Sequence, residues 1–480
     1  MFFRKYRYGY PFFSAVLNPV EIVGALEPIN YLEEKEKWLN SPGKTYNPQF
    51  IYDETGIRHS LHLAKKLRRS IDNIVDLYIR SSDWRSILTS ELLLYQREDL
   101  DVIIPFLESF AKGMVPDSTL ADKTVSRLFG APTQSELDVI AELAIKEESH
   151  RDIILKYLIG ENERSIYSKT KLETVLRDYF HDFKGILTPA EFDALNCKRI
   201  SIDQIVEITK TLAEHIDQHM KSGNISIQIN LCKETDVFGV CRHALSSSHY
   251  IFEVPKIDGY FAGDFVLQVF AHELNSHLRA HISTGELAKK LPNHFQPYIV
   301  SRNQRMLVQE GFASLNGETV LDEKHSMVFE PMLVLGAAYA KAGHNFAETV
   351  HHIYETYKID PDVDNFSLHN DIWSYSQIFN GIADTSAHGN YAFPWKQVYM
   401  IGPLRTLREI CRKDDNYFED PLSMMRYSEL PLKLIRIINH IENDLKQKLA
   451  PDPFEAWDYA HPDPAVRDIT EFTKQLLLDL

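Results

Sequence analysis

The spacing of two histidines is the feature that most constrains this chain. His272 and His277 are separated by four residues, in the sequence His-Glu-Leu-Asn-Ser-His. On a regular helix of 3.6 residues per turn they point about 140° apart, whereas the i, i+4 histidines of a His-Glu-x-x-His zinc motif point about 40° apart. Both imidazoles can face one metal ion only if the helix contains a one-residue π-bulge, a distortion that tends to occur at functional sites. We predict this bulge between Glu273 and Ser276.

The residues before the motif predict a buried helix. Residues 265–271 are almost wholly apolar, and Asp264 is placed to act as the N-cap. A helix that is apolar nearly all round lies inside a protein. Histidines and a glutamate in such a helix need polar partners, because an unpaired buried polar group costs on the order of a few kcal/mol. A metal ion would satisfy them. The alternatives are a hydrogen-bonded pair of core histidines, or a polar stripe of Glu273, His277 and His281 to which the first histidine does not belong.

A glutamate on a later helix is the predicted third ligand. Glu310 stands in the sequence Gln-Glu-Gly-Phe-Ala at residues 309–313, after a loop at 291–297 that contains two prolines. The helix that carries it is predicted to start near Ser301. Gly311, next to Glu310, permits close approach of two helices or of the metal. The rival candidates for the third ligand are His281, His294 and Glu318.

These residue types predict a zinc hydrolase. Imidazole nitrogen and carboxylate oxygen are common zinc ligands, and three of them, from His272, His277 and Glu310, leave the fourth position open for water. Glu273 is the spare carboxylate that could act as general base. A further donor should stabilise the oxyanion, and the candidates are Tyr399 and, behind it, Tyr391 and His388.

Three short segments near the N-terminus extend these two motifs. They are Pro-Ile-Asn at residues 28–30, Glu-Glu-Lys at 33–35 and Pro-Gln-Phe-Ile-Tyr at 48–52. Together with residues 272–277 and 309–313 they resemble the protein family named for its Gln-Glu-Gly-Leu-Ala motif. That family includes the microtubule-associated tyrosine carboxypeptidases. The resemblance extends from about residue 25 to about residue 405.

The resemblance implies roles for four residues. His272, His277 and Glu310 would hold Zn²⁺ and Glu273 would be the catalytic base of a metallocarboxypeptidase whose partner is the C-terminus of a peptide or protein. The chain departs from the family pattern at Phe312, which replaces the usual leucine, and at Asn380, which stands where a Phe-Arg-Gly segment has its arginine. Residues 394–399 match a Lys-Asp-x-x-Tyr segment only in part. The last two departures concern the substrate, not the metal.

A carboxypeptidase must also bind a free carboxylate, and arginine does this best because its planar group meets both oxygens. The candidates are Arg302 and Arg305, with Arg279, Lys396 and Arg405 as further possibilities. Two other functions stay open at this point. One is a different zinc hydrolase, such as an endopeptidase or an amidase. The other is a non-enzymatic binding or regulatory protein in which zinc braces the fold.

Composition excludes several classes of partner. A net charge of −16 at pH 7 argues against non-specific binding to nucleic acid or to an anionic membrane surface, and it disfavours a strongly acidic substrate. Four cysteines are too few for a disulfide framework, which fits a reducing compartment. No uninterrupted apolar segment reaches about 18 residues, so no membrane-spanning helix is expected. We therefore expect a cytoplasmic protein.

The distribution of periodic segments predicts the fold class. Residues 225–231 alternate apolar and polar side chains and residues 250–254 form a second strand signal, both shortly before His272. Elsewhere the pattern is mainly helical. We predict a mostly helical α+β fold with a metallopeptidase-like core, in which a small β-sheet precedes the histidine helix. The expected regions are a helical N-terminal region (1–170), the catalytic core (171–330) and a helical C-terminal region that completes the site (331–480).

Overall fold

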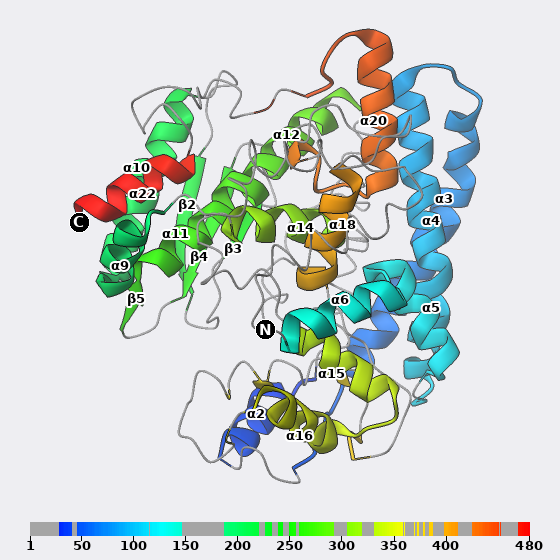
Figure 1. Cartoon of the computed structure of the whole chain (residues 1–480). Helices are drawn as coiled ribbons and strands as arrows, with labels where there is room; N and C mark the ends of the chain where they lie inside the picture. The colour runs from blue at the N-terminus through cyan, green and yellow to red at the C-terminus, as the bar shows by residue number, and fades with distance from the viewer. Residues whose placement is uncertain are drawn as a thin grey trace.

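The computed structural model describes most of the chain, in ranges separated by gaps. These ranges are residues 28–40, 46–114, 116–145, 187–219, 226–232, 239–242, 249–255, 259–291, 305–318, 331–358, 398–410, 425–450 and 469–480, with short stretches between 360 and 386 and residue 452. Within them the chain is mostly helical, as predicted, and it contains two small β-sheets where the sequence predicted one (Figure 1). None of the helices in these ranges has both the length and the apolar character that crossing a bilayer requires. The predicted domain boundaries near residues 170 and 330 lie outside the described ranges.

Two long helices lie side by side along one edge of the molecule (Figure 1). They are α3 (Glu54–Ile79) and α4 (Trp84–Ala111), which follow α2 (Tyr31–Leu39) and precede α5 (Ser118–Phe129) and α6 (Gln134–Ile145). The start of α3 is capped by Asp53, whose side chain accepts a hydrogen bond from the Thr55 amide. Apolar residues of α3 at helical spacing are buried against α4, namely Ile57, Ala64, Leu67, Ile71 and Val75.

The two sheets precede the histidine helix. Strand β1 (Arg199–Ser201) pairs antiparallel with β5 (Tyr260–Ala262), and helices α9 (Pro189–Cys197) and α10 (Ile202–His219) flank β1. In the second sheet β4 (His249–Pro255) lies between β2 (Ser226–Cys232), which is parallel to it, and β3 (Gly239–Arg242), which is antiparallel. The two strands predicted from sequence are thus confirmed to within one or two residues. The central strand buries alternate side chains, Tyr250, Phe252 and Val254, in one hydrophobic cluster with Phe270.

A continuous helical rod crosses the middle of the molecule (Figure 1). It consists of α11 (Gly263–His272), the π-helix η4 (Glu273–Leu278) and α12 (Arg279–Lys290). Helix α14 (Arg305–Glu318) packs against α11 and η4, and α18 (Val398–Ile410) packs against α14. The rod is buried along most of its length, as its apolar sequence predicts.

The C-terminal helices pack onto the earlier parts of the chain. They are α15 (Pro331–Lys341), α16 (Phe346–Tyr357), α20 (Leu432–Leu445) and α22 (Ile469–Asp479). One hydrophobic cluster joins all three regions of the sequence, since it contains Leu88, Phe312 and Ile435. The last helix, α22, packs beside α9, α10 and α11 (Figure 1) and places Leu477 in the cluster that contains Leu278 of the π-helix.

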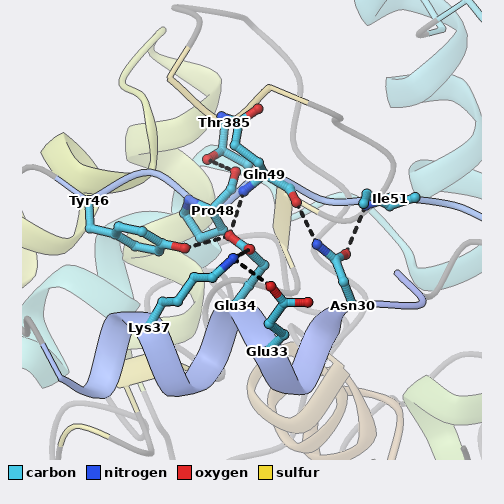
Figure 2. Close-up of polar contacts among 9 residues, drawn as sticks. All are labelled: Asn30, Glu33, Glu34, Lys37, Tyr46, Pro48, Gln49, Ile51 and Thr385. Atoms are coloured by element: carbon cyan, nitrogen blue, oxygen red, sulfur yellow. Dashed lines mark hydrogen bonds and ion pairs between the residues drawn. The ribbon is translucent and has the colours of Figure 1, made fainter.

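The N-terminal segments that carry the family resemblance form a buried polar network (Figure 2). The carboxylate of Glu34 is only 2% exposed; it accepts hydrogen bonds from Lys37 Nζ (2.7 Å), the Tyr46 hydroxyl (2.5 Å) and the Gln49 amide (2.8 Å). Asn30 donates to the Gln49 carbonyl and accepts from the Ile51 amide. These contacts fold residues 46–51 back onto α2.

The same network reaches the C-terminal half of the chain. Thr385 Oγ1 donates to the Pro48 carbonyl (2.7 Å), and the Thr385 carbonyl accepts from the Phe346 amide at the start of α16 (3.2 Å). Beneath it, Trp38 and Trp373 pack in an aromatic cluster with their ring centroids 5.7 Å apart. The opening segments of the chain therefore anchor residues far along the sequence, and their role in this structure is to hold the fold.

Replacing Glu34 by glutamine is expected to lower the free energy of unfolding by about 1–3 kcal/mol at pH 7, because Lys37, Tyr46 and Gln49 lose a buried, charged acceptor. Burial alone would raise the pKa of Glu34, but hydrogen bonds from Lys37, Tyr46 and Gln49 outweigh it and hold the pKa below its ordinary value of 4.5. A carboxylate with a lowered folded-state pKa stabilises the protein above its unfolded pKa and loses this contribution as pH falls through the folded value. The difference between wild type and Glu34→Gln should therefore shrink below pH 4.5.

Urea unfolding at several pH values measures this effect, and Glu33→Gln is the matched control. Glu33 contacts the same Lys37 Nζ at 2.8 Å, but its side chain is 65% exposed. Because exposed ion pairs contribute little, the control should change stability by less than about 1 kcal/mol. Equal losses in the two variants would show that the buried network does not stabilise the fold.

Candidate metal centre

The predicted helix distortion is present. Residues Glu273–Leu278 form a π-helical turn between α11 and α12, which confirms the bulge expected from the histidine spacing. The turn brings His272 Nε2 and His277 Nε2 to 3.1 Å from each other, with the two imidazole planes at 72°. The alternative of a polar stripe to which His272 does not belong is therefore wrong, whereas the 3.1 Å contact is also compatible with the other alternative, a hydrogen-bonded pair of core histidines.

Glu310 meets both histidines. Its Oε2 atom lies 3.4 Å from His272 Nε2 and 3.5 Å from His277 Nε2. One ligand atom from each of the three residues lies within 4.8 Å of the other two, and in the described part of the chain this is the one such group of three that could hold a metal ion. The side chains of His277 and Glu310 are buried, whereas that of His272 is 22% exposed. Of the three side chains, that of His272 is the most exposed to solvent.

The polar atoms at this point suit a bound cation. Glu310 Oε2 and His277 Nδ1 are buried and have no hydrogen-bond partner among the described residues. Two imidazole nitrogens and one carboxylate oxygen that converge in a buried place form a donor set typical of zinc. A divalent cation would give the Glu310 oxygen the partner that it lacks. The residues present therefore fit the ion that the sequence predicts.

The charges of the group are strongly coupled. Burial would raise the pKa of Glu310, but His277 and His272 outweigh it and hold the pKa far below its usual range. Burial would lower the pKa of His277, yet Glu310 and Glu273 raise it above its usual value. Glu310 is thus a carboxylate in the folded protein, and the centre favours positive charge.

Glu273 lies beside the three candidate ligands. Its Oε1 atom is 4.0 Å from His272 Nε2, and the residue is buried. Because Glu273 is the first residue of the π-turn, its carboxylate is held next to the ligand group by the same distortion that joins the histidines. A carboxylate in this place is suited to receive a proton from a water molecule in the centre.

Residues from the C-terminal part of the chain contact the start of α12, directly after the π-helix. Arg279 forms a two-point ion pair with Asp452, with Nε 2.9 Å from Oδ1, and it donates to Met425 Sδ at 3.4 Å. His281 Nδ1 lies 2.6 Å from Glu429 Oε1, and both side chains are buried. His281, one of the rival ligands, is thus engaged with a different carboxylate. Of the other rivals, His294 and the side chain of Glu318 lie outside the described part of the structure.

Gly311 is required by helix packing. A Cβ atom at Gly311 would lie 2.6 Å from the Gly402 carbonyl oxygen and 2.3 Å from Thr406 Oγ1. A Cβ at Gly402 would in turn lie 2.5 Å from the Leu307 carbonyl oxygen. Helices α14 and α18 therefore cross backbone against backbone immediately after Glu310. Of the two reasons predicted for this glycine, the close approach of helices is the one observed.

The predicted substrate-binding residues are only partly described. Tyr399 lies in α18 and is partly buried against a cluster that contains Val398 and Leu307. Arg305 is the first residue of α14, and its side chain is not described. The remaining candidates Arg302, Lys396, Tyr391 and His388 lie outside the described ranges, as do the departure at Asn380 and residues 394–397 of the partly matching segment.

Two candidate arginines already have carboxylate partners. Arg279 pairs with Asp452, and Arg405 pairs with Glu136 through Nε at 2.8 Å. Their guanidinium groups are neutralised by the protein itself.

Sequence reasoning missed Asn316, which contacts the π-turn from α14. Asn316 Nδ2 donates to Ser276 Oγ at 2.6 Å, and both side chains are buried. The available signal was an asparagine next to apolar positions of a buried helix, since buried amides are almost always hydrogen-bonded.

Comparisons of the chain with protein-family models, with curated proteins and with solved structures give no match.

Proposed function

We propose that this chain is a zinc-dependent peptidase and that it acts as a carboxypeptidase. The observation that carries the proposal is the π-turn, which places His272 and His277 against Glu310 and leaves Glu273 beside them. A π-helical turn with converging polar side chains is a costly arrangement for a buried helix, and such turns tend to occur at functional sites. The resemblance to the tyrosine carboxypeptidases supports the choice of reaction.

Each residue of the centre has a chemical role in this proposal. His272 and His277 would hold Zn²⁺ through their imidazole nitrogens, and Glu310 would hold it through a carboxylate oxygen. Zinc supplies Lewis acidity, which polarises the scissile carbonyl and lowers the pKa of water toward about 7. The Glu273 carboxylate takes a proton from the attacking water and delivers it to the leaving amine. The hydroxyl of the water joins the carbonyl carbon, so the products are a carboxylic acid and an amine. Burial of Glu310 and His277 keeps competing water away from the ligand atoms.

The C-terminal specificity is the finer part of the proposal. Arg302 and Arg305 are the proposed carboxylate-binding residues, because Arg279 and Arg405 are held by Asp452 and Glu136. Tyr399 is the proposed oxyanion donor. Peptides with free and with amidated C-termini test this specificity, since a carboxypeptidase releases single residues from the free ends alone. Internal cleavage of both sets would indicate an endopeptidase instead.

Metal analysis of the purified protein tests the centre itself. Wild type is expected to contain one zinc per chain. Loss of a residue that only hydrogen-bonds a metal ligand lowers metal affinity by about 10–100-fold. His277→Ala and Glu310→Ala each remove a proposed ligand, so we expect them to lower the zinc affinity by more than this. His281→Gln is the control, because glutamine can still donate a hydrogen bond to Glu429 and His281 is outside the group. Equal zinc content in all four proteins, or none in wild type, would refute the metal site.

A further inference from the structure

A hydrogen bond joins the π-turn to the helix that carries Glu310. Ser276 stands in the middle of the turn, directly before His277, and is 1% exposed. Its Oγ atom accepts from Asn316 Nδ2 at 2.6 Å and lies 3.5 Å from the Phe312 carbonyl oxygen. Asn316 and Phe312 both belong to α14. The contact therefore links the two elements whose separation decides whether three ligand atoms converge.

The π-turn needs such a contact to persist. Runs of π-helix are rare because their backbone geometry is less favourable than that of the α-helix, and they are kept where the surroundings stabilise them. An α-helical turn in place of η4 would rotate His277 by about 100° relative to His272 and would carry Ser276 with it. The Ser276–Asn316 hydrogen bond is specific to the distorted form.

A second contact holds the end of the same turn. Asn316 Nδ2 lies 3.6 Å from Met425 Sδ, and the same sulfur accepts from Arg279 Nη1 at 3.4 Å. Arg279 is the first residue after the turn and is clamped by Asp452. The middle and the end of the π-turn are thus tied to one point on the C-terminal part of the chain, and Asn316 is the residue common to both ties.

From these contacts we infer that Asn316 is a positioning residue of the metal centre. It sets the affinity for metal by holding Ser276, and through it His277, at the proper distance from Glu310. It does not bind the metal itself. This inference rests on the proposed function in one respect, namely that His272, His277 and Glu310 bind zinc.

The test is a double-mutant cycle read out as zinc affinity. Asn316→Ala and Ser276→Ala are each expected to weaken zinc binding by about 10–100-fold, measured by competition with a chelator. The double variant should bind no more weakly than either single variant, because both substitutions remove the same hydrogen bond. Ser276→Ala removes a single hydroxyl, so it keeps the inference testable even if Asn316→Ala folds poorly.

The absorption spectrum of bound cobalt separates a positioning role of Asn316 from a purely structural one, because a loss of stability alone would leave the spectrum unchanged. The visible absorption of bound Co²⁺ depends on the arrangement of its ligands, so Asn316→Ala and Ser276→Ala should both change this spectrum in the same way. Thr124→Ala is the matched control, since Thr124 is a buried hydrogen-bonding residue in α5 that donates to the Leu120 carbonyl. The control should lose stability and keep both the zinc affinity and the cobalt spectrum of wild type.

The outcomes separate this inference from the proposed function. Wild-type protein that binds no zinc would refute the proposed function. Wild-type protein that binds zinc, together with Asn316→Ala and Ser276→Ala that bind it equally well, would overturn the positioning role alone. Additive losses in the double variant would also overturn it, because Asn316 would then act by a route other than Ser276.

Discussion

Glu273→Gln is expected to keep one zinc per chain while lowering kcat by about 10²–10⁴-fold. Glutamine fills the same space, but its amide cannot accept the proton of the attacking water. The metal should remain, because Glu273 Oε1 is 4.0 Å from His272 Nε2 and lies outside the group of three ligands. KM should change little, since the loss is confined to the transition state. Steady-state kinetics on a cleaved peptide, together with metal analysis of the same sample, measures both quantities.

Glu286→Gln is the control for this prediction. Glu286 lies on α12 of the same helical rod and pairs with Lys289 at the surface, so its replacement should leave kcat within about twofold of wild type. Two results would contradict the assigned role. Full turnover in Glu273→Gln would mean that another group is the base, and loss of zinc would mean that Glu273 is itself a ligand.

The sequence was most informative where the geometry of the α-helix allowed only one local backbone arrangement. Histidines at i and i+5 cannot face one point on a regular helix, so a shared role for His272 and His277 required the distortion found in η4. The strand β2 was found by its period of two, and β4 by the second strand signal at residues 250–254. Local periodicity reports local structure, and both features are local.

Contacts between distant segments could not be read in this way. Met425, Glu429 and Asp452 contact the start of α12, directly after the π-turn, and each is more than 140 residues from its partner there. Periodicity along one helix indicates which of its faces is buried, but it does not indicate which later segment covers that face. The strand β3 was also missed, because a strand of four residues is too short for its alternation to be recognised.

The N-terminal motif illustrates a different limit of sequence reasoning. Its residues entered the sequence analysis only through the resemblance to a peptidase family. In the structure Glu34 and Asn30 hold the backbone of residues 46–51, and Thr385 joins this network from the other end of the chain (Figure 2). A resemblance identifies which residues matter to a family, whereas the contacts show whether they act on a substrate or on the fold.

Gly311→Ala is expected to lower the free energy of unfolding by about 3 kcal/mol or more. Alanine is the better helix former by about 1 kcal/mol, so intrinsic propensity predicts the opposite sign. Packing decides the result, because the added Cβ would lie 2.6 Å from a backbone oxygen of Gly402 that moves only if α14 and α18 separate. Urea unfolding of the metal-free protein measures the loss without any contribution from bound zinc.

Gly336→Ala is the matched control, because the same substitution is expected to have the opposite effect on stability there. Gly336 lies within α15, and a Cβ there would meet side-chain carbons at 3.5 Å or more, which is ordinary contact. Its replacement should leave stability unchanged or raise it by up to about 1 kcal/mol. The two alanine substitutions should therefore change the free energy of unfolding in opposite directions.

Because Gly311 adjoins Glu310, Gly311→Ala should also weaken zinc binding. If the two variants were equally stable, α14 and α18 would not cross at this glycine, and the position of Glu310 would depend on some other contact.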